Sequence, residues 1–276
     1  MRLKLIILAL MVSTAGLTQS SLPYRDAAAS ADKATVTGLF ISFESLTPAE
    51  RRLLDLTPFP ELQSIEFLSG VPNDVRLDSA QYASITHLSL NDCGLSVLPR
   101  WIMRGETIGF TKLASLSVRV NKLKQVSICN LENLVVLDVS FNKGINVNCL
   151  RSSSTLTQLS ADGSGLDLCQ LPLGLTHLSA QLHSGRIAMD ELSCLSALAG
   201  LRSLDISSNA ISAKHLLRYL DASAIDSLYL NNVSISAKKR TRLRSRTGLV
   251  LFYNERPPRA KANPIDSEST IWRPSY

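Results

Sequence analysis

The chain has 276 residues, of which 45% are hydrophobic and 5% aromatic. This hydrophobic content is ordinary for a packed protein and excludes a chain that is disordered throughout. Few aromatic residues predict a core of Leu, Ile, Val and Ala, which fits thin repeated layers better than one large globule. The net charge is +6, but residues 238–276 hold ten Lys or Arg and three acids, so the rest of the chain sums to about −1. Only the C-terminal end could therefore serve as a footprint for anions.

The first 20 residues have the features of a secretory signal. Arg2 and Lys4 precede an uninterrupted apolar run of eight residues, Leu5–Val12. Small residues follow at Ser13–Ala15, with Ser20 as a second candidate for the cleavage site. A membrane span needs about 20 apolar residues, so this run predicts a secreted, extracellular protein rather than an anchored one. An uncleaved anchor or a buried N-terminal helix is the alternative.

An apolar phrase recurs after residues 21–34, a segment that we expect to be flexible. The phrase is clearest at residues 201–211, LRSLDISSNAI, with apolar residues at Leu201, Leu204 and Ile206 and a polar one at Asn209. Its copies begin at residues 36, 62, 85, 113, 134, 156, 175, 201 and 225, and a half-strand over 249–252 ends the array. The intervals run from 19 to 28 residues, which predicts stacked supersecondary units.

The phrase and its spacing resemble those of the leucine-rich repeat family, whose units have about 20–29 residues. The resemblance covers residues 35–254 and implies an α/β solenoid of eight to nine repeats plus caps. In such a horseshoe, short strands form the concave sheet and the convex side is irregular or helical. LDLCQLPLGLTHLSA resembles the short bacterial-type repeat, whereas longer intervals leave room for outer helices, so the array is mixed. The Asn position is expected to satisfy backbone groups of the next coil.

Two outer segments predict helices. Thr47 precedes a Pro and lies three residues before Glu50, which is typical of a capped helix start. We expect that helix to continue from Arg51 to Leu56. The stretch Ile211–Leu220 predicts another helix, with Ser212 at its cap.

Strand residues that point away from the core form the concave face, where such solenoids usually bind. This face is rich in Ser and short acids and poor in aromatic residues. Arg and Tyr are typical interface anchors. We select as carriers of a polar interface Arg119, Asp138, Asp162, Asp205 and Tyr229. The alternative is that the Ser and Asp residues only keep the face soluble.

A basic run falls where the outer helix of the last repeat is expected: Lys238, Lys239, Arg240, Arg242, Arg244 and Arg246. It could dock on nucleic acid, an acidic glycan or an anionic membrane, or act as a nuclear address after delivery into another cell. A solvated cap helix is the alternative. Residues 255–276 contain four Pro and no apolar periodicity, so we expect a disordered tail.

Three of the five cysteines, Cys129, Cys149 and Cys169, lie 20 residues apart. Neighbouring coils rise by about 4.8 Å, so a Cys129–Cys149 or a Cys149–Cys169 disulfide could form in an exported protein. We favour the alternative that the cysteines are small buried residues, because an odd count argues against a disulfide framework. Asn232 begins the one N-glycosylation sequon, Asn-Val-Ser.

No sequence pattern indicates catalysis. The chain has no CxxC or HxxxH pair and none of the common nucleophile, phosphate-loop or dinucleotide motifs. We therefore expect no enzymatic activity, no metal and no cofactor. The sequence predicts a secreted module that recognises a protein through its concave face, and its resemblance to small exported members of the family implies host–microbe interaction or an extracellular receptor. The alternative is a delivered effector whose basic C-terminal region binds a polyanion or directs it to a nucleus.

Overall fold

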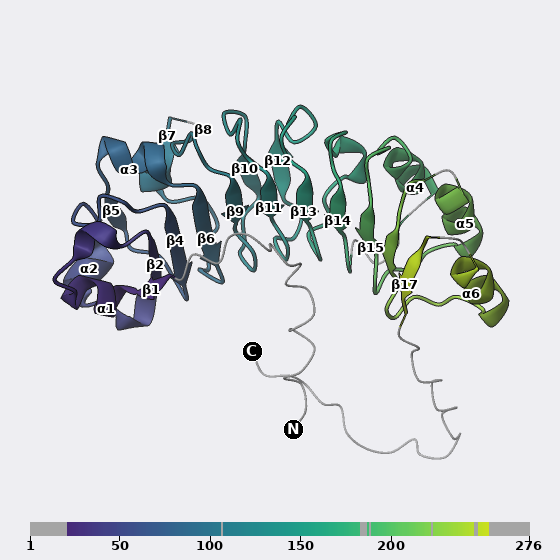
Figure 1. Cartoon of the computed structure of the whole chain (residues 1–276), viewed down its shortest axis with the longest axis horizontal. Helices are drawn as coiled ribbons and strands as arrows, with labels where there is room; N and C mark the ends of the chain where they lie inside the picture. Colours follow the sequence, from purple (N-terminus) through teal and green to yellow (C-terminus); the bar gives the residue numbers. More distant parts are fainter. Residues whose placement is uncertain are drawn as a thin grey trace, which may run out of the picture.

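The computed structural model describes residues 21–253, apart from residues 106, 183–186, 188, 222 and 246–247. The expected signal, the expected tail and Arg246 therefore lie outside the described residues. The described chain forms a curved solenoid, with one long sheet along the inner side of the arc and turns, short strands and helices along the outer side (Figure 1).

The long sheet has eleven strands, and each strand pairs in parallel with its neighbours. In spatial order they are β1 (Leu22–Pro23), β2 (Gly38–Ser42), β4 (Ser64–Leu68), β6 (His87–Asn91), β9 (Ser115–Ser117), β11 (Val136–Asp138), β13 (Gln158–Ser160), β14 (His177–Ser179), β15 (Ser203–Asp205), β16 (Ser227–Tyr229) and β17 (Val250–Phe252). The register stacks the same apolar position of successive repeats, as with Leu137 between Leu116 and Leu159. Each strand expected from the repeated phrase is present.

The length of each repeat decides what forms on the outer side. The short repeats between residues 113 and 175 carry β10 (Gln125–Ser127), which pairs with β12 (Asn146–Asn148), and the 3-10 turn η5 (Leu168–Gln170). The longer repeats that follow carry α4 (Met189–Leu195), α5 (Ala213–Asp221) and α6 (Ala237–Arg244). Nearer the N-terminus lie α3 (Ser79–Ser84), η4 (Arg100–Ile102) and the antiparallel pair β7 (Met103–Arg104) and β8 (Thr107–Ile108). The expected helix over 211–220 is thus α5.

The helix expected from Thr47 is shorter than predicted. Thr47 caps α2 (Pro48–Arg52) and forms a reciprocal capping box with Glu50. The helix then ends, and β3 (Leu53–Asp55) pairs in parallel with β5 (Asp74–Arg76). The continuation to Leu56 was wrong because extended backbone turns alternate residues to one side, which buries both Leu54 and Leu56 completely.

The segment expected to be flexible, residues 21–34, instead covers the open N-terminal end of the solenoid. It carries β1, α1 (Tyr24–Ala29) and the start of the turn η2 (Lys33–Thr35). Tyr24 and Ala27 are buried against the first repeats. Arg25 forms an ion pair of 2.7 Å with Glu50, and the Tyr24 hydroxyl donates to the same carboxylate. The expectation was wrong because the sheet edge of the first repeat needs a cover, and these residues supply it.

Buried asparagines close the turns of the central repeats. The side-chain amide of Asn142 donates to the carbonyls of Val118 and Val139, and its oxygen accepts the Leu123 amide at 3.0 Å. Asn121 and Asn209 donate in the same way. The predicted role of the Asn position is confirmed, with one correction: the coil reached is the preceding one.

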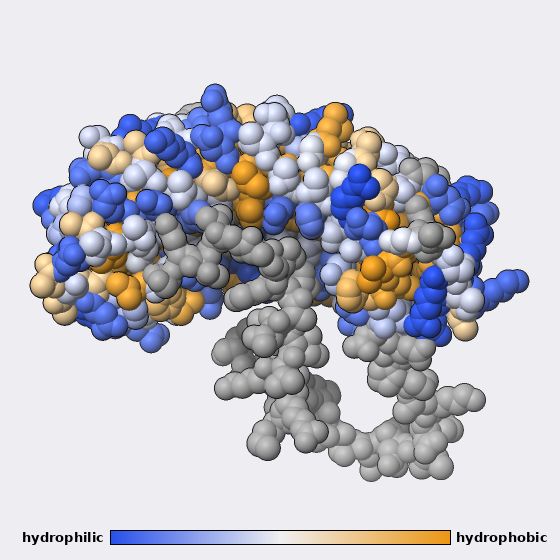
Figure 2. Space-filling model, in the orientation of Figure 1, coloured by the Kyte–Doolittle hydropathy of each residue, from blue (hydrophilic) through white to orange (hydrophobic). Residues whose placement is uncertain are grey.

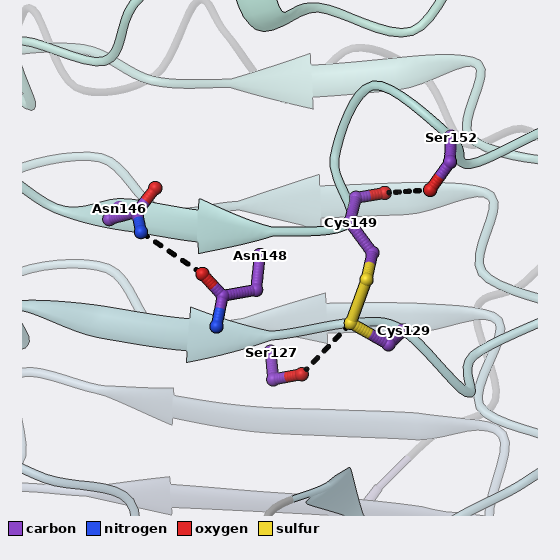
Figure 3. Close-up of a disulfide and its surroundings, with 6 residues drawn as sticks. All are labelled: Ser127, Cys129, Asn146, Asn148, Cys149 and Ser152. Carbon is purple, nitrogen blue, oxygen red and sulfur yellow. Dashed lines mark hydrogen bonds between the residues drawn. A yellow bond between two sulfur atoms is a disulfide. The ribbon is translucent and has the colours of Figure 1, made fainter.

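The cysteines correct the sequence interpretation. Cys129 and Cys149 form a disulfide on the outer side (Figure 3), and Cys169 is bonded to Cys194 of α4. The expected Cys149–Cys169 pairing was wrong because Cys149 is already bonded to the preceding coil while α4 places Cys194 against η5. The favoured alternative of buried thiols was wrong for these four residues. Cys93 stays a thiol, and burial raises its pKa to about 11.

Candidate functional site

The concave face is lined by the strand residues that lie between buried neighbours. The register places Asp138 beside Ser117 and Ser160 of the adjoining strands. The face continues with the residue two places further along each repeat, such as Arg119 or Asp162. Ser and Asp predominate, as the sequence predicted.

Polar side chains on this face bond across to the next repeat. Oδ1 of Asp162 accepts the Ser179 hydroxyl at 2.6 Å and the Gln181 amide at 2.8 Å. The Ser140 hydroxyl accepts the amide of Asp162 at 3.1 Å. Oδ1 of Asn91, a residue that the sequence interpretation did not select, accepts the Ser117 hydroxyl and the Arg119 backbone amide of the next repeat. Several residues that look available for binding therefore also hold the sheet together.

Asp205 cannot make the direct contact that was predicted for it, because it is only 3% exposed. Its Oδ1 accepts the Ser207 amide, and its Oδ2 accepts the Gln181 side-chain amide, both at 2.9 Å. Burial raises the pKa of Asp205 to about 6, although these hydrogen bonds lower it, and the charge of Asp162 adds to the rise. Asp205 is a buried linker between repeats.

Arg119, Asp138 and Asp162 do come together on the concave face. Burial raises the pKa of Asp138, while the Ser140 hydrogen bonds and the charge of Arg119 lower it. Burial raises the pKa of Asp162 as well, and the charge of Arg119 again acts against the rise. Each carboxylate uses Oδ1 within the sheet. These bonds tie both carboxylates to the sheet, and the charge of Arg119 lies close to them.

Phe141 is a surface residue that the sequence interpretation missed. Its ring is 38% exposed, and the Arg119 guanidinium lies over it with Cζ 5.2 Å from the centroid. Gly163 of the next repeat also lies against the ring, and a Cβ at this position would come within 3.0 Å of it. Phe141 has a φ of 57°, and Val120 of the preceding repeat and Leu182, two repeats further on, adopt the same left-handed backbone and are exposed. An aromatic residue directly before the Asn position was the available signal.

Tyr229, the fifth candidate, lies at the C-terminal end of the same sheet. It stacks on Phe252 of β17, with ring centroids 4.2 Å apart and planes inclined by 4°. Phe252 is 42% exposed. Tyr229 is therefore part of a second aromatic pair, separated from Arg119 by the strands β11, β13, β14 and β15.

Asn232 follows β16 near this second pair. Asn232 and Ser234 are exposed, which leaves the sequon accessible, and the Asn232 amide donates to the Ser208 hydroxyl at 3.3 Å. Five strand spacings of about 4.8 Å, roughly 24 Å in all, separate its repeat from that of Arg119. A glycan here would narrow only the C-terminal end of the concave face.

The basic run lies on the outer side, away from the concave candidates. Lys238, Lys239, Arg240, Arg242 and Arg244 belong to α6. Arg242 forms an ion pair of 3.3 Å with Asp221, and Arg240 lies over the Tyr253 ring. Residues 21–253, where described, hold no cluster of three or more His, Cys, Asp or Glu that could bind a metal ion. None of the described helices is long and apolar enough to cross a membrane.

A long parallel sheet with one strand per repeat, closed by Asn turns, is the architecture of a leucine-rich repeat solenoid, and this protein has that fold. Its two disulfides fit an extracellular protein. No protein-family model matches the sequence, and no curated protein matches it.

Solved structures of other leucine-rich repeat proteins are similar to it. The TLR13–ssRNA13 complex matches with 16% identity and a TM-score of 0.50, over 71% of this chain and 31% of that one. An internalin C2 from Listeria monocytogenes matches with 20% identity and a TM-score of 0.45, over 63% and 73% of the two chains. Human 5T4 gives 20% and 0.45, over 68% and 73%. The chain thus spans about a third of the TLR13 chain, and at these identities the likeness is one of fold.

Proposed function

We propose that this protein is a secreted binding module, not an enzyme, that recognises another protein through its concave face. The observation that carries the proposal is the stack of Arg119 on the half-exposed ring of Phe141. Exposed Arg and aromatic side chains are the usual anchors of protein interfaces. Host–microbe contact is the setting that the resemblance to small exported repeat proteins suggested.

The surroundings of this stack also favour recognition of a protein. Val120 and Leu182 supply exposed apolar surface along the same line of turns. The Arg119 guanidinium, with Asp138 and Asp162 near it, supplies charged groups beside this apolar surface. An apolar anchor with charged groups around it is the common composition of a protein interface. The left-handed backbone of Val120 is strained for a β-branched residue, and such strain is concentrated at functional sites.

The test is site-specific photo-crosslinking of the secreted protein on its source tissue or culture. A photoreactive phenylalanine analogue replaces Phe141 in one sample and Val97 in the control. Val97 is 72% exposed and lies between β6 and η4, outside the concave sheet. We expect a discrete cross-linked protein from position 141 and none from position 97.

The captured protein is then purified and its affinity is measured. We expect the double variant Arg119→Ala, Phe141→Ser to raise Kd by about tenfold or more. Val97→Ala should leave Kd unchanged. Equal cross-linking at both positions, or an unchanged Kd for the double variant, would refute the concave site.

A further inference from the structure

Positive charge gathers on the last outer helices of the solenoid. α6 has five basic residues and no acid, and Leu243 is its buried residue. Lys214 and Arg218 of α5 are also exposed. Over residues 213–245, seven Lys or Arg accompany two acids, Asp221 and Asp226. Figure 2 shows strongly hydrophilic residues at this end of the solenoid, where Figure 1 places α5 and α6.

This arrangement lowers the stability of α6. Lys238 with Arg242, and Arg240 with Arg244, are like-charged pairs four residues apart, which repel each other on a helix surface. Lys238 and Lys239 lie in the first turn, where the positive end of the helix dipole disfavours cations. Ser236, at the N-cap, makes no side-chain capping bond. In α2, by contrast, an acid lies in the first turn and is paired, since Glu50 forms an ion pair with Arg25.

Contacts within the protein account for little of this charge. The side chains of Arg242 and Asp221 are 64% and 58% exposed, and ion pairs so exposed to water contribute little to stability. Lys238, Lys239 and Arg244 are exposed on α6. The charge is therefore available to an external anion.

We propose that α6 and the adjoining exposed residues of α5 bind a sulfated glycan chain. Both disulfides fit an oxidising, extracellular compartment, where sulfated polysaccharides are the prevalent linear polyanions. The eight residues of α6 span about 12 Å, so the helix and the side chains of α5 together match a short segment of such a chain. This site is separate from the concave face and independent of the function proposed above.

The composition of the surface disfavours the other polyanions. Sites for single-stranded nucleic acid use exposed aromatic rings on which bases stack, whereas Tyr219 of α5 is buried and the Tyr253 ring is covered by Arg240. A helix that lies on an anionic membrane needs an exposed apolar face, and Leu243 of α6 is buried. Point charges without rings or apolar side chains suit sulfate groups.

The test is titration of the full disulfide-bonded chain with a heparin-derived octasaccharide at ~50 and ~200 mM salt, a range over which charge-driven binding falls steeply. Lys238→Gln, Lys239→Gln and Arg242→Gln are combined in one variant. Lys112→Gln, Lys122→Gln and Lys143→Gln, all exposed on the central repeats, form a control with the same change of net charge. A third variant, Asp221→Asn, removes an acid from the proposed site.

We expect the α6 variant to raise Kd by about tenfold or more and to reduce the slope of log Kd against log salt concentration by about two to three. The control should stay within about twofold, and Asp221→Asn should tighten binding. The control should keep the wild-type melting temperature, and the other two variants should stay close to it, because the altered side chains are exposed and exposed charge pairs contribute little to stability. Equal weakening by both triple variants, no binding by the wild type, or tighter binding of a charge-matched single-stranded oligonucleotide or of phosphatidylserine vesicles would overturn the proposal.

Discussion

The two halves of the solenoid hold their layers together by different means. In the N-terminal half, rings fill the core, namely Tyr24, Phe59, Phe67, Trp101 and Phe110. In the C-terminal half, taken here from β9 onward, the buried ring among the described residues is Tyr219, and both disulfides lie there. Short repeats with thin aliphatic layers bury less apolar surface per coil, so covalent links between coils supply what the rings supply elsewhere.

The two ends of the solenoid also differ in how their charged residues are used. At the N-terminal end, Glu50 is bonded to Thr47, Arg25 and Tyr24. At the C-terminal end, α6 has five basic residues and no acid, and the ion pair of Arg242 with Asp221 is exposed to water. The contrast separates charges that stabilise the fold from charges that are available for binding.

The largest effect is expected from removing a ring of the N-terminal half. Phe67 is fully buried, with its centroid 5.6 Å from that of Trp101. Phe67→Ala should lower the free energy of unfolding by about 3–5 kcal/mol, measured by denaturant titration. Phe252→Ala, at a ring that is 42% exposed, is the control and should cost far less. Similar losses for both would show that ring burial does not hold this half together.

In the C-terminal half, the corresponding change is removal of a disulfide. Cys129 and Cys149 are separated by 20 residues, and closing a loop of that size is worth about 3 kcal/mol. Replacing both by Ser should lower the free energy of unfolding by about that amount. A reductant should then lower the melting temperature of the wild type more than that of the variant. Insensitivity of the wild type to reductant would contradict the comparison.

A third prediction concerns Glu50. Although partial burial opposes it, hydrogen bonds from Thr47 and Arg25 lower the pKa of Glu50 to about 2 from its usual 4.5. A depressed carboxyl pKa stabilises the fold above 4.5, and this contribution is lost as the pH falls towards 2. Glu50→Gln should therefore cost about 2 kcal/mol at neutral pH, and the difference from the wild type should vanish in denaturation curves taken near pH 2. A difference that is independent of pH would exclude this ionisation.

The smallest effect, with the opposite sign, is expected at Asp205. Burial raises its pKa to about 6 from 3.8, so the ionised form is disfavoured in the folded state and stability rises as the pH falls from 6 towards 3.8. Asp205→Asn should increase the free energy of unfolding at pH 7.5 by roughly 1 kcal/mol and so raise the melting temperature. The gap between variant and wild type should narrow by pH 4. A variant that is less stable at both values would show that the carboxylate is required by Gln181 and Ser207.

The strands could be predicted because each repeat has an inward Leu or similar apolar residue at the same position, and this spacing is visible in the sequence. The end of α2 and the regular structure of residues 21–34 could not be predicted, because both depend on which residues cover a neighbouring coil. The Cys169–Cys194 bond was hidden for a related reason, since α4 lengthens its repeat and breaks the spacing of 20.

The concave candidates were only partly predictable. Alternation along the strands located Asp138 and Asp205 alike, but a pattern of inward and outward residues does not reveal that Gln181 covers one of them. Phe141 lies in the turn after its strand, outside the alternating pattern. Its contact with Arg119 therefore could not be predicted from the sequence.

The two disulfides also fix how the molecule responds to tension. Each links one coil to the next, with partners 20 and 25 positions apart in the sequence. Pulled from its ends, the oxidised chain cannot unravel those stretches, and at about 3.5 Å per residue its contour is shorter by ~150 Å than that of the reduced chain. The extension at which the pulled chain becomes taut would therefore depend on whether the disulfides are oxidised or reduced.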